Sequence, residues 1–115
     1  MKLAIIGSRK FADYERLRDE VLKNFPVETI EAVVSGGAKG ADTLAVQFAR
    51  EYNIPLIEFL PEWESLGRTA GYERNTLIIN EADCVIAFPM KGSCGTWDSV
   101  RKAWALDKQV IIVEK

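Results

Sequence analysis

The chain has 115 residues, of which 48% are hydrophobic and 28% are charged, and its formal net charge is −2. This length corresponds to about one domain, so residues 1–115 are expected to share a single core. The weak acidity gives no overall electrostatic indication of nucleic-acid binding, and the absence of histidine excludes Ser-His-Asp triads, Cys-His nucleophiles and His-ligated zinc.

The first predicted elements are a strand over residues 2–6 and a helix over residues 11–25. The strand is almost continuously apolar, which is typical of a parallel strand covered on both faces. It ends in the small-residue turn Gly7-Ser8-Arg9. Asp13 is the expected N-cap of the helix, and Pro26 is expected to end it.

A second strand is predicted over residues 32–34 and a second helix over residues 43–50, joined by the segment Ser35–Asp42 with the sequence SGGAKGAD. Three glycines on a strand-to-helix turn allow a positive φ and close approach of a ligand. The helix N-terminus adds unpaired donors and a positive dipole end. The segment therefore suits a phosphate or another anion. The alternative is a turn that needs glycine only for packing, with Asp42 complementing the helix dipole.

A third strand is predicted over residues 56–60, after the break at Asn53-Ile54-Pro55. The loop that begins at Pro61-Glu62-Trp63 leads to a helix that starts at about Ser65 or Thr69 and ends at Glu81. Helical spacing predicts that Leu77 and Ile78 face the core.

A fourth strand is predicted over residues 84–88 and is followed by a third glycine-rich turn, residues 91–96. Ser93 or Thr96 is the expected cap of a helix that runs to Asp107. This helix is expected to bury Val100, Ala103 and Trp104 on one side, and Trp104 has a dimer contact as its alternative role. The last strand covers residues 109–113.

Apolar strands that alternate with helices predict an α/β fold: a three-layer α/β/α, Rossmann-like domain with a five-stranded parallel sheet. The expected strand order is 3-2-1-4-5, which places the first strand at the topological switch point. The turns after strands 1, 2 and 4 would then open together at the carboxyl edge of the sheet, where ligands of such sheets bind.

The sequence has no apolar run long enough to span a membrane and no signal peptide before its first strand, so a cytoplasmic protein is expected. In a reducing compartment Cys84 and Cys94 are expected to be free thiols. Cys94, at the start of a predicted helix, is also a candidate nucleophile with a lowered pKa, but the chain offers no histidine as its base.

Four segments in this order resemble the SLOG superfamily, and most closely its small YpsA-like branch: Gly7-Ser8-Arg9, Ser35–Asp42, Ala70-Gly71-Tyr72-Glu73-Arg74-Asn75 and Gly92-Ser93-Cys94-Gly95-Thr96. The resemblance covers nearly the whole chain. It implies a Rossmann-like domain that binds a nucleotide or nucleotide-derived ligand, with no separate cofactor, and that often forms a homodimer. The ligand-binding residues it implies are Gly7, Ser8, Arg9, Ser35, Gly36, Gly37, Ala38, Gly40, Asp42, Arg74, Asn75, Gly92, Ser93, Gly95 and Thr96.

The superfamily includes the LOG phosphoribohydrolases, which use an arginine and a glutamate. Arg74 matches the arginine, whereas Ser99 stands at the glutamate position and Asp98 precedes it by one residue. The resemblance thus implies Arg74 and Asp98 as candidate catalytic residues. A guanidinium also matches phosphate geometry, although Arg74 has an ion pair with Glu73 or Glu81 as its alternative, and Asp98 has a dipole contact.

Three functions follow from these observations. The leading one is binding of a nucleotide-derived ligand, as a sensor, with Trp63 and Trp97 as candidates to stack on a base. The second is cleavage of a base from a nucleoside 5′-monophosphate by a LOG-like phosphoribohydrolase. The third is single-strand DNA binding in the manner of the related DprA proteins, for which Lys10, Lys39 and Lys91 are the candidate contacts.

Overall fold

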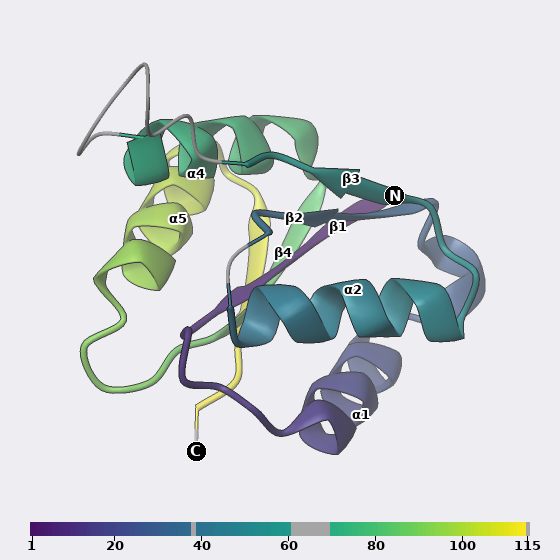
Figure 1. The fold of residues 1–115 in the computed structure, drawn as a ribbon. Helices are drawn as coiled ribbons and strands as arrows, with labels where there is room; N and C mark the ends of the chain where they lie inside the picture. Colours follow the sequence, from purple (N-terminus) through teal and green to yellow (C-terminus); the bar gives the residue numbers. More distant parts are fainter. Residues whose placement is uncertain (38, 61–69, 115) are drawn as a thin grey trace.

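A computed structural model describes residues 1–37, 39–60 and 70–114. Five strands alternate with helices along the described chain (Figure 1). The strands are β1 (Lys2–Gly7), β2 (Ala32–Ser35), β3 (Leu56–Glu58), β4 (Cys84–Phe88) and β5 (Gln109–Ile112). The helices are α1 (Tyr14–Asn24), α2 (Ala41–Glu51), α4 (Ala70–Glu81) and α5 (Cys94–Ala105), with a short 3-10 turn at Val27–Thr29.

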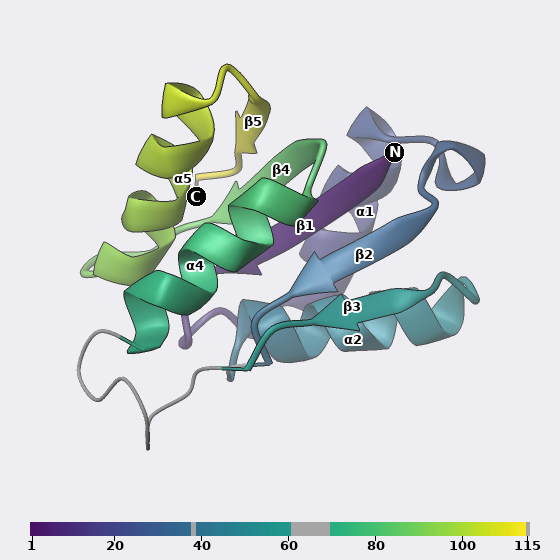
Figure 2. The same ribbon diagram turned by 90° about the horizontal axis from the view of Figure 1, so that it is seen from above.

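The strands form one parallel sheet in the order β3-β2-β1-β4-β5, as predicted (Figure 2). Strand β1 lies at the centre, and its last residue, Gly7, is in register with Phe88 at the end of β4. The loops that leave β1 and β4 therefore begin side by side at the carboxyl edge of the sheet. The predicted Rossmann-like α/β fold is confirmed.

Helices cover both faces of the sheet. Alternate strand residues such as Leu3 and Ile5 pack with α1 and α2, whereas Ala4 and Ile6 pack with α4 and α5. Most of these strand side chains have no exposed surface, which is why the strands are apolar throughout. Each face buries its own hydrophobic cluster.

Several predicted boundaries shift in the structure. Helix α1 begins at Tyr14 rather than residue 11, because the Asp13 carboxylate accepts a hydrogen bond from the backbone N–H of Arg16 at 3.1 Å and caps the helix there. Ser93 is the N-cap residue of α5, but its hydroxyl accepts from the Met90 N–H at 2.9 Å instead of capping the helix. Strands β3 and β5 end two and one residues earlier than predicted, at Glu58 and Ile112.

The prediction that Leu77 and Trp104 lie in the core is wrong. Leu77 is 50% exposed and Trp104 is 52% exposed, whereas Ile78, Ile79, Val100 and Ala103 are buried. The sheet-facing stripe of α4 runs through Ile78 and Ile79, one position beyond the predicted one. Trp97, a candidate stacking residue, packs against the cluster on the α4 and α5 face, and Trp63 lies outside the described residues.

The two cysteines are free thiols, as predicted. Among the helices of the described ranges, none has both the length and the apolar character needed to cross a membrane.

Candidate functional site

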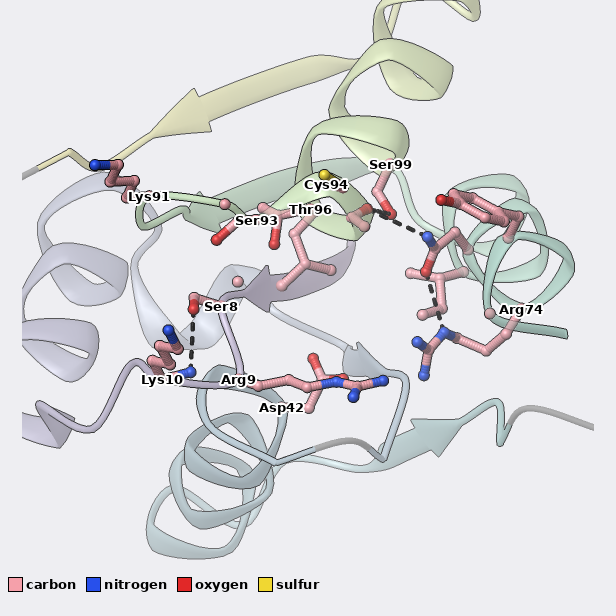
Figure 3. Close-up of a pocket in the computed structure, with 18 residues that line it drawn as sticks. Ser8, Arg9, Lys10, Asp42, Arg74, Lys91, Ser93, Cys94, Thr96 and Ser99 are labelled. Carbon is pink, nitrogen blue, oxygen red and sulfur yellow. Dashed lines mark hydrogen bonds between the residues drawn. The ribbon is translucent and has the colours of Figure 1, made fainter. Parts of the chain in front are cut away.

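A cavity of about 500 Å³ lies at the carboxyl edge of the sheet, between the loops after β1 and β4 and the first turns of α4 (Figure 3). Its size falls in the range of small-molecule sites. Its lining consists of Ile6, Gly7, Ser8, Arg9, Lys10, Asp42, Gly71, Tyr72, Arg74, Asn75, Ile78, Lys91, Gly92, Ser93, Cys94, Gly95, Thr96 and Ser99. All four segments that carry the family resemblance thus contribute to one space, the segment Ser35–Asp42 through Asp42.

The β1 turn forms one wall of the cavity. The Ser8 N–H donates to the Phe88 carbonyl at 3.0 Å, and the Ser8 hydroxyl accepts from the Lys10 N–H at 3.0 Å. A Cβ on Gly7 would lie 2.7 Å from both the Phe88 oxygen and the Ala41 Cβ. Gly7 is therefore required for packing at this point, whether or not a ligand is present.

The glycines of Ser35–Asp42 mostly pack against the protein itself. A Cβ on Gly36 would overlap the Arg74 guanidinium, and one on Gly40 would overlap the Ser8 carbonyl. Gly37 lies against Leu60 and lines a separate hollow of about 390 Å³ beside α2. Among the described residues of this segment only Asp42 lines the main cavity, and Ala38 lies outside the described residues.

The Ser35 hydroxyl is likewise directed within the segment, donating to the Asp42 carbonyl and accepting from the Gly37 N–H, both at 3.4 Å. The backbone of Gly40–Ala41 contacts the β1 turn, where the Ala41 N–H donates to the Ser8 carbonyl at 3.1 Å. The main structural effect of this segment is to fix the β1 turn and Arg74 relative to each other.

Arg74 and Asn75 form a hydrogen-bonded network at the wall made by α4. Arg74 donates from Nη1 to the Gly36 carbonyl at 2.7 Å and from Nε to Asn75 Oδ1 at 3.1 Å. Asn75 Nδ2 donates to the Gly95 carbonyl and to Asp98 Oδ2, each at 3.2 Å. Asn75 is buried, and its amide connects α4 with α5, because its oxygen accepts from Arg74 and its nitrogen donates to Gly95 and Asp98.

The pKa of Arg74 is lowered from its ordinary value, first by burial and then by the neighbouring charge of Arg9, while Asp42 acts in the opposite direction. Burial and a like charge both penalise the charged guanidinium. An anion placed in the cavity would relieve this penalty, because it would neutralise the two neighbouring cations.

The N-terminus of α5 forms the third wall. Gly92 has a φ of +83°, which favours glycine, and leads into Cys94, Gly95 and Thr96. The first intrahelical hydrogen bond is donated by Trp97 to the Ser93 carbonyl, so the N–H groups of Gly95 and Thr96 precede the helical ladder. These amides and the helix dipole favour a negative charge at this wall.

Asp98 lies beside the cavity rather than in its lining. Its carboxylate forms an ion pair with Lys102 Nζ at 2.8 Å and accepts the hydrogen bond from Asn75. The neighbouring Ser99 does line the cavity, and its hydroxyl donates to the Gly95 carbonyl at 3.3 Å.

The charges around the cavity are mainly positive. Four cationic side chains line it, those of Arg9, Lys10, Arg74 and Lys91. Among the described lining residues, Asp42 supplies the one carboxylate. The sequence had suggested Lys10 and Lys91 only as DNA contacts at the edge where the turns were expected to meet, and both line this cavity. Ile6 and Ile78 were missed as site residues, since their patterns are those of ordinary core positions.

Comparisons with known proteins agree with this fold. A family model described as YspA, cpYpsA-related SLOG family matches residues 1–65. The gene 61 protein of Mycobacterium phage D29 is 33% identical over 112 residues, covering 89% of this chain and 87% of that protein.

Two solved structures share the fold. DNA processing protein A from Helicobacter pylori, described for its single-stranded DNA binding mode, has a TM-score of 0.73 at 23% identity, over 97% of this chain. DprA from Streptococcus pneumoniae has a TM-score of 0.78 at 20% identity, over 96% of this chain. The chain spans 64% and 49% of these two longer proteins.

Proposed function

Because this chain belongs to the YspA, cpYpsA-related SLOG family, we propose that it binds a nucleotide or nucleotide-derived anion in the cavity between β1, β4 and α4. The observation that carries the proposal is electrostatic. A chain with a net charge of −2 presents four cationic side chains around this one cavity. Such local concentration of one sign in a concave site attracts a ligand of the opposite sign.

Two of these cations, Lys10 and Lys91, form no ion pair with a described residue, and a third, Arg9, lies near Asp42 and Arg74 (Figure 3). The fourth, Arg74, is fixed by Gly36 and Asn75 through two of its nitrogens. A guanidinium held in this way is oriented before a phosphate arrives, so less rotamer entropy is lost on binding.

The proposed binding mode places a phosphate at the Gly95 and Thr96 amides, next to Arg74. The apolar side chains of Ile6 and Ile78 offer a surface to the sugar or base, as in other small-molecule sites that combine apolar walls with a few polar groups. The Ser35–Asp42 segment supports the site by holding Arg74, with Asp42 as its contribution to the lining. Ligand binding of this kind suits a sensor.

Binding is a better proposal than N-glycosidic cleavage. The candidate catalytic carboxylate, Asp98, is neutralised by Lys102 and held by Asn75, away from the described cavity lining. The LOG-like reaction remains testable, because it requires release of free base from a nucleoside 5′-monophosphate and loss of that release in Asp98→Asn. Absence of base release together with tight binding supports a sensor.

Single-strand DNA binding is a second candidate, favoured by the fold shared with the Helicobacter pylori protein, whose single-stranded DNA binding mode has been described. The same cations would then contact backbone phosphates. A fluorescent oligonucleotide distinguishes the two functions. If the oligonucleotide binds with an affinity that falls strongly with salt, and mononucleotides give no response, single-strand DNA binding is favoured.

The proposal is tested by thermal shift and calorimetry with a panel of nucleoside mono-, di- and triphosphates and ADP-ribose. Saturable stabilisation of the native chain is expected. Arg9→Gln should weaken binding about tenfold, as for loss of a charge-assisted contact. Arg101→Gln, an exposed position outside the cavity lining, is the matched control and should bind like the native chain. No stabilisation by any member of the panel would overturn the proposal.

A further inference from the structure

The cations of the cavity are separated into two groups. In Figure 3 the Arg9 side chain extends toward Arg74, and both guanidinium groups lie near Asp42. Lys10 and Lys91 lie toward the end of the view that is remote from Arg74. The N-terminal turn of α5, with Ser93 and Thr96, lies between the two ends.

The fold explains why the two lysines share one end. Lys10 follows β1 and Lys91 follows β4, and these strands are paired to their last residues, Gly7 and Phe88. The Ser8 N–H donates to the Phe88 carbonyl at 3.0 Å and keeps the two loops together beyond the sheet. Arg74 instead comes from α4, across the cavity from these loops.

Each end therefore concentrates positive charge. At one end the Arg9 side chain extends toward Arg74 (Figure 3), whose pKa is lowered by burial and then by the charge of Arg9. At the other end, Lys10 and Lys91 are both exposed and have no acidic partner in the part of the chain that the structure describes. One phosphate bound by Arg74 would leave the lysines without a counter-charge.

We propose that the cavity takes a ligand with two separated anionic groups, one bound by Arg9 and Arg74 and the other by Lys10 and Lys91. This inference rests on the proposed nucleotide-binding function and deepens it. The part that joins the two anionic groups would lie against Ile6 and Ile78, and the Gly95 and Thr96 amides would remain available to the phosphate beside Arg74. A nucleoside with phosphates on both the 3′ and 5′ oxygens has this chemistry, whereas a 5′-diphosphate carries its charges on adjacent groups.

The test compares four probes by calorimetry for each of the four common bases: the nucleoside 5′-monophosphate, 3′-monophosphate, 5′-diphosphate and 3′,5′-bisphosphate. The bisphosphate is expected to bind at least tenfold more tightly than either monophosphate or the diphosphate. Lys10→Gln and Lys91→Gln should each reduce this advantage several-fold.

Lys23→Gln, an exposed lysine on α1 outside the cavity lining, is the matched control and should preserve the full advantage. Equal affinities for the mono- and bisphosphates would overturn this inference and leave the proposed function intact. A diphosphate as tight as the bisphosphate would also overturn it. If no probe binds with any base, the inference fails, and the proposed function fails with it only if the triphosphates and ADP-ribose of the wider panel also do not bind.

Discussion

The Arg74 guanidinium donates a hydrogen bond to the carbonyl oxygen of Gly36 at 2.7 Å, across 38 positions of sequence. The contact joins α4 to the loop after β2, so two of the segments that carry the family resemblance meet through the Arg74 side chain and the Gly36 backbone. It also explains the glycine, because any larger residue at position 36 would occupy the volume of the guanidinium.

Gly36→Ala should therefore move Arg74 rather than unfold the domain. The new methyl would overlap the far end of a long, flexible side chain, so the loss of stability should stay near 1 kcal/mol. Affinity for the best nucleotide of the panel should fall about tenfold as the guanidinium leaves its position. Urea unfolding and calorimetry measure the two effects, and unchanged affinity would contradict the assigned role of Arg74.

Gly95→Ala should weaken binding without any loss of stability. The nearest atom to a Cβ at position 95 is Asn75 Nδ2 at 4.0 Å, so the chain itself has space for the methyl group. Alanine favours a helix over glycine by up to about 1 kcal/mol, so stability should be equal or slightly higher. The methyl would stand at the cavity wall and weaken phosphate binding.

Calorimetry on Gly95→Ala should thus give a lower affinity together with an unchanged or raised Tm. Native affinity in this variant would indicate that the ligand does not approach the α5 N-terminus. Gly7→Ala is the contrasting variant, because its Cβ would meet the backbone at 2.7 Å. It should destabilise the fold by about 1–3 kcal/mol.

Lys108→Met should destabilise the domain without affecting the site. The Lys108 ammonium donates to the carbonyl oxygens of Ile79, Asn80 and Ala82 at the C-terminal end of α4. A cation at this end of a helix interacts favourably with the negative end of the dipole, and it satisfies carbonyls that lack intrahelical partners. The expected loss is about 1–2 kcal/mol in urea unfolding, against a change within about 0.5 kcal/mol for Lys91→Met. Equal effects of the two substitutions would argue against the capping role.

The pH dependence of binding should arise from titration of the ligand's phosphate rather than of a protein side chain. The chain has no histidine, the side chain whose ordinary pKa lies between pH 5 and 8. A phosphate monoester loses its second negative charge below its second pKa of about 6. Affinity should therefore weaken as pH falls from 7.5 to 5. A phosphodiester analogue, whose charge is constant in this range, should bind equally at both pH values; a parallel loss would point to a titrating group on the protein.

The sequence predicted the fold and the position of the site more directly than it predicted which helix residues are buried. The alternation of apolar strands and helices predicted the sheet order because right-handed crossovers leave few topologies for such a pattern. Motifs after β1, β2 and β4 and on α4 predicted a site at the carboxyl edge. The errors at Leu77 and Trp104 arose because a helix turns 100° per residue, so a shift of one position exchanges a buried side chain for an exposed one.

Sequence alone determined the α/β class, the strand order and the segments that border the site, because these follow from local periodicity and from the conformations that glycine permits. Only the tertiary structure decided what each segment does there. Gly36 and Gly40 accommodate Arg74 and the β1 turn, Asp98 is paired with Lys102, and Lys10 and Lys91 meet at one cavity. These relationships join residues distant in sequence, and the parallel sheet brings them together by aligning the carboxyl ends of its strands.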